Sequence, residues 1–159
     1  MAKTPIGRIL VVCAGNICRS PMAEALLRQR LKDHPTLKAV DVSSAGTIAY
    51  DGNPPSADAV EELHERYGLD INSHRARSVT RQSKADLVLT MDRATTATVE
   101  AIGLSAPVLL LGDFVGTGEE VADPYGGPRL GYRRAAAQLD RLAGAVVARL
   151  VEDAAGERQ

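Results

Sequence analysis

The sequence predicts an α/β fold in which helices cover both faces of a four-stranded parallel sheet, in three layers (α/β/α). Segments typical of strands alternate with segments typical of helices, and no internal repeat or linker interrupts them. Such alternation favours a parallel sheet, because each crossover connection places a helix on one face. A chain of 159 residues can bury one sizeable core, so we expect a single domain over residues 1–159.

Four segments have the composition of strands. Ile9 to Val12, Asp86 to Met91 and Ala106 to Leu111 are largely apolar, which is typical of strands buried on both faces of a sheet. Lys38 to Ser43 alternates apolar and polar residues, so we expect a short strand there too. Ligands of open α/β sheets bind beyond the carboxyl ends of the strands, and Cys13 follows the first strand at that point.

The first two helices are expected after the first and second strands. Pro21 suits the first turn of a helix that reaches Leu31, because its missing N–H would have no helical partner there. Ser56 is expected to cap a second helix over residues 57–67, and Gly68 to end it.

Two further helices are expected in the second half of the chain. The third is expected over residues 94–102. Residues 132–151 carry leucines and valines at spacings of three and four, which predicts a long last helix. Residues 152–159 are polar, so we expect a frayed tail.

Composition and charge exclude several functional classes. The formal net charge of -1 gives no reason to expect nucleic acid or a membrane as a partner. No segment has the apolar length of a signal peptide or a membrane span. The chain has two cysteines, so we expect no disulfide scaffold and a cytoplasmic, reducing location.

The stretch from Cys13 to Ser20 has the features of an anion-binding loop that carries a nucleophile. A strand end, a short loop and a helix N-terminus direct backbone N–H groups at one point. Gly15 and Asn16 are the residue types most able to adopt the positive φ that a tight loop needs. Arg19 can hold two phosphoryl oxygens and stabilise the attacking thiolate, to which the Ser20 hydroxyl can donate a hydrogen bond. The stretch therefore predicts a phosphate-ester site.

Other interpretations of these residues have less support. A cysteine that ends an apolar strand is usually a core residue, and Cys followed six positions later by Arg is a pattern that chance often produces. The absence of a Gly-Lys dipeptide excludes a Walker-type nucleotide loop. The two cysteines and three histidines have no metal-ligand spacing, and there is no Cys-x-x-Cys pair.

With these residues in view, the chain resembles the low-molecular-weight protein-tyrosine-phosphatase family. Residues 13–21 match every fixed position of the family signature, Cys-x-Gly-Asn-x-Cys-Arg-Ser-Pro. The likeness also includes Met22-Ala23-Glu24, Ser44-Ala45-Gly46, Ser73 to Arg77, Asp86 to Asp92 and Asp123-Pro124-Tyr125. The resemblance implies strand order 2-1-3-4 and an enzyme without metal or cofactor. It also implies that a phosphorylated protein is the substrate and inorganic phosphate a product.

The resemblance assigns roles to individual residues. Asp123 matches the general acid, and a phenolate leaves phosphorus poorly unless such a group protonates it. Ser44 and His74 match residues that hold the loop Asn16 by hydrogen bonds, and Asp92 by analogy belongs to the supporting polar network. The expected phosphate-binding residues are Ala14, Gly15, Asn16, Ile17, Cys18, Arg19 and Ser20.

Cys18 resembles a second cysteine that, in this family, forms a reversible disulfide with the nucleophile. A Cys13–Cys18 disulfide would stop catalysis until it is reduced. The simpler alternative for Cys18 is a small packing residue.

Three side chains favour phosphotyrosine as the substrate. Ile17 is a bulky apolar residue within the loop, and Tyr125 and Tyr50 could flank a flat ring. Residues 72–84 contain four basic residues and no acid, which is typical either of a rim for acidic phosphopeptides or of a solvated face. These are Arg75, Arg77, Arg81 and Lys84.

Three alternative functions differ in what they require. Bacterial protein-arginine phosphatases are similar to this chain at residues 111–113 and 123–127. They carry Thr in place of Ile17, so Ile17 favours phosphotyrosine as the substrate. The pair Gly126-Gly127 stands where eukaryotic members carry a second aromatic residue, and it indicates a bacterial source. An arsenate reductase would need further cysteines after Cys18 to relay electrons, and none follows. A non-catalytic phosphopeptide-binding module would be expected to lack the nucleophile or the acid.

Overall fold

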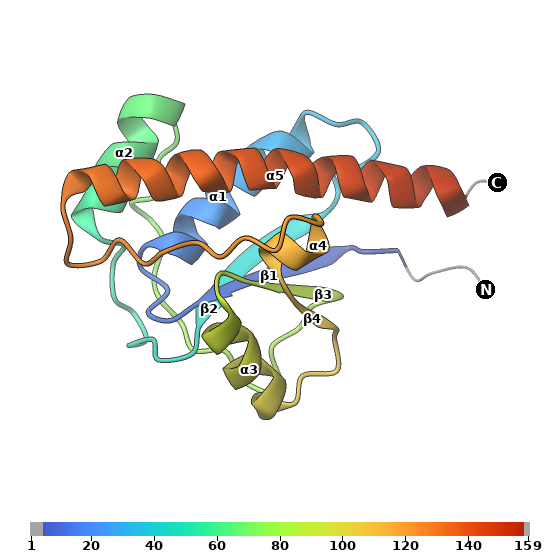
Figure 1. The fold of residues 1–159 in the computed structure, drawn as a ribbon, viewed down its shortest axis with the longest axis horizontal. Coiled ribbons are helices and arrows are strands. Elements are labelled where there is room, and N and C mark those ends of the chain that lie inside the picture. The colour runs from blue at the N-terminus through green and yellow to red at the C-terminus, as the bar shows by residue number, and fades with distance from the viewer. Residues whose placement is uncertain (1–4, 158–159) are drawn as a thin grey trace.

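The computed structural model describes residues 5–157 and contains one sheet of four parallel strands (Figure 1). The strands are β1 (Arg8–Cys13), β2 (Asp41–Gly46), β3 (Leu87–Thr90) and β4 (Val108–Leu110). Their order across the sheet is β2-β1-β3-β4, which confirms the predicted order. Because β1 is a central strand, its carboxyl end lies between the ends of β2 and β3.

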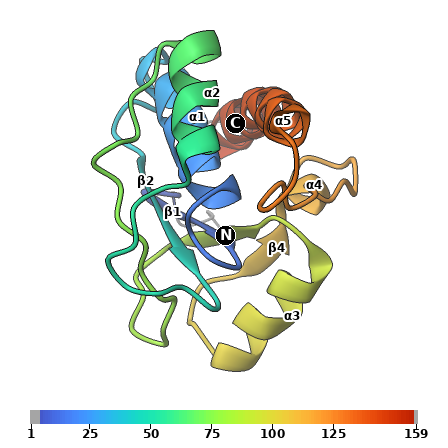
Figure 2. The same cartoon turned by 90° about the vertical axis from the view of Figure 1, so that its left-hand side faces the viewer.

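Helices cover both faces of this sheet, as predicted. α1 (Arg19–Lys32), α2 (Ala57–Tyr67) and α5 (Arg129–Glu157) lie on one face, and α3 (Arg93–Ile102) lies on the other (Figure 2). A single helical turn, α4 (Leu111–Phe114), follows β4 directly. The three-layer α/β/α architecture is therefore confirmed, and only α4 was not predicted.

Two apolar cores hold the layers together. The larger core joins Ile9 of β1 to Met22 of α1 and to the apolar residues of α2 and α5. The smaller core joins Leu10 of β1 to Val99 of α3. Successive side chains of β1 thus enter opposite cores, as the two-residue period of a strand requires. A fully buried aliphatic side chain contributes about 1.5–3 kcal/mol, so both faces of β1 are fixed and Cys13 ends a rigid element.

The second strand begins three residues later than the sequence predicts, at Asp41 rather than Lys38. Residues 35–39 form turns instead, and Val40 N donates to the Leu37 carbonyl at 3.0 Å. The strand extends to Gly46, which pairs with the last residue of β1. Residues 44–46 were predicted as part of a turn-rich connection because they are small, although all three are buried.

The last helix is longer at both ends than predicted. It begins at Arg129 and continues to Glu157. The prediction of a frayed tail is wrong for residues 152–157, because Val151 packs against the larger core and Arg149 pairs with Asp153 at 3.4 Å; residues 158–159 lie outside the described residues. No helix within residues 5–157 has an apolar stretch long enough to cross a membrane.

Candidate active site

The loop between β1 and α1 forms a cradle at the carboxyl end of the sheet. Cys13 is the last residue of β1, and Arg19 is the first residue of α1. Asn16 has φ 58° and is the only residue other than glycine with positive φ within residues 5–157. The expectation for Asn16 is thus met, whereas Gly15 does not adopt positive φ. A Cβ on Gly46 would lie 2.4 Å from the Ala14 carbonyl oxygen, so only glycine lets the end of β2 approach the loop so closely.

The side chain of Asn16 holds this loop through three hydrogen bonds. Arg77 N donates to Asn16 Oδ1 at 2.9 Å, and because this donor is a backbone N–H, it fixes which end of the amide is which. Asn16 Nδ2 therefore donates to Ser20 Oγ at 2.8 Å and to Ser44 Oγ at 3.0 Å. His74 Nε2 lies 2.7 Å from the Asn16 carbonyl oxygen, so that ring nitrogen carries a proton. The structure thus places Ser44 and His74 beside Asn16.

The sulfur of Cys13 faces two hydrogen-bond donors. Ser20 Oγ lies 3.0 Å from Cys13 Sγ, and Asn16 N donates to the same sulfur at 3.3 Å. Since Ser20 Oγ already accepts from Asn16 Nδ2, its single hydrogen is free to point at the sulfur. Two hydrogen bonds to the sulfur suit a nucleophile that carries negative charge when it attacks and when it departs.

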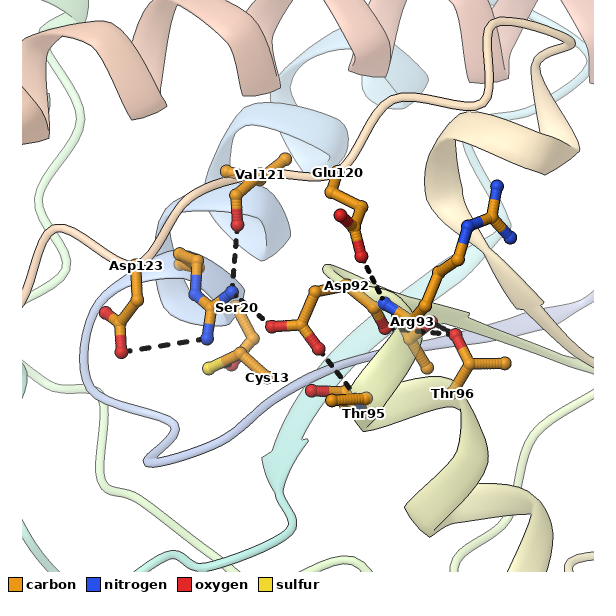
Figure 3. A network of polar contacts seen from close by, with 12 residues as sticks. Cys13, Ser20, Asp92, Arg93, Thr95, Thr96, Glu120, Val121 and Asp123 are labelled. Carbon is orange, nitrogen blue, oxygen red and sulfur yellow. Dashed lines mark hydrogen bonds and ion pairs between the residues drawn. The ribbon is translucent and has the colours of Figure 1, made fainter.

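Arg19 supplies the positive charge of the cradle and is buried, with an exposed fraction of 3%. Arg19 Nη1 donates to Asp92 Oδ2 at 2.8 Å and to the Val121 carbonyl at 2.9 Å, as Figure 3 shows. Both hydrogens of Nη1 are therefore engaged by the protein. Nη2 lies on the side of Asp123, 3.8 Å from Asp123 Oδ2. The two hydrogen bonds of Nη1 thus fix the orientation of the guanidinium.

Asp92 links this cation to α3. Its Oδ1 accepts from Thr95 N at 2.7 Å, so the carboxylate also caps the N-terminus of that helix (Figure 3). Partial burial acts to raise the pKa of Asp92, but the hydrogen bonds from Arg19 and Thr95 outweigh it, and the pKa lies below its ordinary value. Asp92 is therefore charged at neutral pH and balances Arg19.

Asp123 lies at the mouth of a pocket of about 300 Å³ whose floor is the loop. Cys13 and Arg19 line the same pocket. The side chain of Asp123 is 51% exposed, and its Oδ1 accepts from Tyr125 N at 3.1 Å. The structure therefore brings the thiol and the guanidinium of one loop and a carboxyl group about a hundred residues away in sequence to one pocket.

Most side chains in the walls of this pocket are large and apolar. Ile17, Tyr50 and Tyr125, the residues that the sequence suggests for a substrate pocket, line it together with Ile48 and Asn53, which the sequence does not suggest. Ile48, Tyr50 and Tyr125 are 71%, 78% and 65% exposed. Large apolar side chains at such exposure around a concave site are typical of a surface that a ligand covers.

The four basic residues between positions 72 and 84 do not line this pocket. Arg77 Nε donates instead to the Ser44 carbonyl at 2.9 Å, and Arg75 Nη1 donates to the Asn72 carbonyl at 2.9 Å. These two side chains therefore satisfy carbonyl groups of the fold, and the interpretation of the segment as a rim of this pocket has no support in the structure.

Cys18 is a loop residue that lines the pocket, and its buried sulfur contacts two hydroxyl groups. Its sulfur is 3.4 Å from Ser56 Oγ and 3.4 Å from the Tyr132 hydroxyl. Burial raises the pKa of the Cys18 thiol, so it stays protonated at neutral pH. Both cysteines are free thiols, and the Cys13–Cys18 disulfide stays a prediction. The sequence identified Ser56 only as a helix cap and did not identify this role of Tyr132, because both contacts join distant segments.

This fold and site together define a class of protein. A cysteine at the end of a central parallel strand faces a buried arginine, backbone N–H groups and a carboxyl group in one pocket. Within residues 5–157, no group of three or more His, Cys, Asp or Glu side chains is placed to hold a metal ion. The arrangement is that of a cysteine-dependent protein phosphatase.

The comparison with protein families gives the same class. The model of the family described as low molecular weight phosphotyrosine protein phosphatase matches residues 8–155. The chain therefore belongs to this family, as its resemblance implied.

Bacterial relatives match most of the chain. It is 40% identical over 149 residues to the probable low molecular weight protein-tyrosine-phosphatase EpsP of Ralstonia nicotianae, covering 91% of this chain and 97% of that protein. It is 36% identical over 129 residues to the low molecular weight protein-tyrosine-phosphatase Etp of Escherichia coli K12, covering 79% and 82%.

Solved structures of two specificities have this fold. The low molecular weight protein tyrosine phosphatase from T. tengcongensis has a TM-score of 0.80 at 37% identity, covering 88% of this chain and 97% of that chain. A structure of the arginine phosphatase YwlE has a TM-score of 0.83 at 32% identity, covering 92% and 97%. The fold therefore does not decide between phosphotyrosine and phosphoarginine.

Proposed function

We propose that the protein is a protein-tyrosine phosphatase that hydrolyses phosphotyrosine monoesters through a cysteinyl-phosphate intermediate. The observation that carries the proposal is the pocket itself, in which Cys13 and Arg19 lie at the floor, Asp123 lies at the mouth, and Ile17 and Tyr125 form apolar walls. A phosphoryl group fits the polar floor, and an aromatic ring fits the apolar walls.

In the first step, the Cys13 thiolate attacks phosphorus and forms the S–P bond. The bond between phosphorus and the phenolic oxygen breaks, and Asp123 donates its proton to that oxygen. Arg19 and the backbone N–H groups of the loop hold the other three phosphoryl oxygens. Because these groups are fixed before the reaction, they stabilise the charge of the transition state without reorganising.

In the second step, a water molecule attacks the phosphoryl group of the intermediate. Asp123, now a carboxylate, takes a proton from that water, the S–P bond breaks, and inorganic phosphate is formed. The leaving group of this step is the Cys13 thiolate, and the hydrogen bonds from Ser20 and Asn16 N stabilise it as it departs. The thiolate is then ready for the next substrate.

The support for phosphotyrosine over phosphoarginine comes from one side chain of the loop. Ile17 presents no hydroxyl or other polar group to the substrate, and it lines the pocket with the exposed rings of Tyr50 and Tyr125. A phosphorylated guanidinium carries N–H groups that need acceptors, whereas the ring of phosphotyrosine needs only apolar contact. The apolar wall therefore favours the ring.

Phosphoarginine is the second candidate substrate. The specific observation in its favour is the likeness to the YwlE arginine phosphatase, which extends over 92% of this chain. Gly126 also has φ 80°, so the turn after Tyr125 carries no second side chain against a ring. The aromatic wall is therefore thinner beyond Tyr125.

The test is a comparison of kcat/KM for two peptides of the same sequence, one with phosphotyrosine and one with phosphoarginine. We expect the wild type to prefer phosphotyrosine. Ile17→Thr should reduce this preference by about tenfold, since the loss of apolar contact in a pocket changes discrimination by 10–200-fold. Cys13→Ser lacks the thiolate nucleophile, so its rate serves as the background rate without enzyme turnover. A wild-type preference for phosphoarginine would overturn the assignment.

We also propose the setting in which the enzyme works. Residues 1–159 act as one phosphatase domain on a phosphorylated protein in the cytoplasm, because a thiolate nucleophile must stay reduced. Oxidation would join Cys13 to Cys18 and stop catalysis until a thiol reduces the disulfide.

A further inference from the structure

The segment that carries Asp123 is fixed at its start by the sheet and the cradle. Val121 N donates to the Met91 carbonyl at 2.8 Å, and the Val121 carbonyl accepts from Arg19 Nη1 at 2.9 Å. Beyond Val121 the segment follows the pocket mouth and ends at Arg129, the first residue of α5. The direction of the Asp123 side chain therefore also depends on the contacts that hold the other end of the segment, at Arg129.

The first turn of α5 supports the residue that follows Asp123. Pro124 is buried, and a Cβ on Gly131 would lie 3.5 Å from the Cβ of Pro124. Gly127 N donates to the Pro124 carbonyl at 3.1 Å, and Gly131 N donates to the Pro128 carbonyl at 3.0 Å. The segment is thus a compact turn on the start of α5, and a shift of this helix end moves Pro124 and the carboxyl group beside it.

Arg129 ties this helix end to α2. Arg129 Nη1 lies 2.7 Å from Glu61 Oε2, and Nη2 lies 3.4 Å from Glu62 Oε1 and 3.3 Å from Glu65 Oε2. The side chains of Glu61 and Glu65 are 58% and 61% exposed, and exposed ion pairs contribute little. The side chain of Glu62 is 1% exposed, so the pair Glu62–Arg129 is the one with a large effect.

The stability of α2 alone does not explain the contact between Glu62 and Arg129. A buried carboxylate requires a cation, but Arg66, one turn later on the same helix, already places Nε 2.8 Å from Glu62 Oε2. That contact is an ion pair without hydrogen-bond geometry, and within residues 5–157 Oε2 accepts no hydrogen bond. What Arg129 adds, and Arg66 cannot, is a connection from α2 to the segment that carries Asp123.

We propose that Arg129, held by the buried Glu62, is a positioning residue that directs the Asp123 carboxyl group toward the leaving-group oxygen. The proposal rests on the proposed function, in which Asp123 is the general acid. Proton transfer requires the donor and acceptor oxygens to lie within about 3 Å. A displaced start of α5 therefore weakens proton transfer, while Cys13 and Arg19 keep their places.

The test is the leaving-group dependence of kcat/KM, which covers the steps up to departure of the leaving group. Phenyl phosphate releases a basic phenolate that needs a proton, whereas dinitrophenyl phosphate releases a weakly basic one that does not. We expect Arg129→Met to lower kcat/KM for phenyl phosphate by about tenfold, part of the 10²–10⁴ that a general acid supplies, and for dinitrophenyl phosphate by less than about twofold. In an Asp123→Ala background, the same change should no longer affect the two substrates differently.

Arg66→Met is the matched control. It removes the other cation beside Glu62 but touches no part of the segment that carries Asp123, so it should destabilise the fold and leave the ratio of the two substrates unchanged. Arg129→Lys keeps the charge, should restore part of the ratio, and provides the measurement if Arg129→Met does not fold.

Two results would contradict these assignments, and they differ. If Arg129→Met lowers kcat/KM equally for both substrates, or if Arg66→Met changes their ratio as much, Arg129 acts only on stability and the positioning role is overturned. If Asp123→Ala itself leaves the ratio unchanged, Asp123 is not the general acid, and the proposed mechanism fails instead.

Discussion

Asn16→Ala should disable the cradle and destabilise the fold at the same time. The side chain makes hydrogen bonds with Ser20 Oγ, Ser44 Oγ and Arg77 N, and the residue has φ 58°. Each buried hydrogen bond contributes about 1 kcal/mol, and alanine at positive φ costs about 1 kcal/mol. The three hydrogen bonds and the backbone together predict a loss of about 4 kcal/mol in the free energy of unfolding.

The same variant should lose activity for a separate reason. Without Asn16 Nδ2, the Ser20 hydroxyl is no longer held with its hydrogen toward Cys13 Sγ, and it can turn to the Ala45 carbonyl, 3.5 Å away. The loop N–H groups also lose the conformation that directs them at the phosphoryl group. Misplacement of about 1 Å in an active site can cost 10²-fold, so we expect kcat/KM for an aryl phosphate to fall by about 10²-fold.

Urea unfolding measures the first effect, and initial rates measure the second. Asn72→Ala is the control, because Asn72 is exposed and its side chain bonds only to nearby Asp70. It should change the free energy of unfolding by less than about 0.5 kcal/mol. A loss in Asn16→Ala below about 1 kcal/mol, the contribution of a single hydrogen bond, would refute the reasoning.

Three further variants test other parts of the structure. Asp123→Ala should lower kcat for a phosphotyrosine peptide by about 10²–10⁴; in steady-state rates, a loss confined to KM would mean that another group is the acid. The hydrogen bond from Arg141 lowers the pKa of Glu119 from 4.5 to about 2. Glu119 therefore stabilises the fold above pH 4.5, and this contribution is lost as the pH falls through 2. In pH-dependent unfolding, Glu119→Gln should differ from wild type at neutral pH and converge with it in acid; a constant difference would contradict this. Gly46→Ala would place a Cβ 2.4 Å from the Ala14 carbonyl oxygen, so it should destabilise the fold by about 1–3 kcal/mol and weaken phosphate binding in calorimetry, and unchanged binding would show that the loop can move aside.

Elements with local signals at their ends could be predicted from the sequence. The bounds of α2 are an example: Ser56 Oγ accepts from Ala59 N at 3.3 Å, and Gly68 has φ 66°. Both interactions lie within a few residues of the helix end, so the sequence contains the information. The interior strands β1 and β3 were recognisable for a similar reason, since burial on both faces requires continuous apolar residues.

Elements whose limits depend on distant contacts could not be predicted in this way. The end of β2 is made of small residues that pair with β1 and press against the loop, and no local pattern distinguishes them from a turn. The last turns of α5 are polar, but Val151 packs on the core and keeps them helical. In both cases tertiary packing decides the boundary.

The residues of the candidate site also differ in whether local sequence or distant contacts identify them. The loop from Cys13 to Ser20 is continuous, so its chemistry could be inferred from residue types and spacing. Asp123 is about a hundred residues away in sequence and could be assigned only through the family resemblance. Ile48 and Tyr132 had no signal that separates them from ordinary loop and core residues, because their contacts exist only in three dimensions.

Phosphate binding and protonation of the leaving group are connected through Arg19, which contacts the segment that carries Asp123. Arg19 Nη1 donates to the Val121 carbonyl, two residues before Asp123. A change that moves the Val121 carbonyl should therefore disturb both the cation that binds phosphate and the acid that protonates the leaving group, so KM and kcat should change together. The far end, at Arg129, has no contact with Arg19 and is held by α2 instead. A change at the far end should therefore weaken proton transfer and preserve phosphate binding, because the two functions share the contact at Val121 and not the contacts at Arg129.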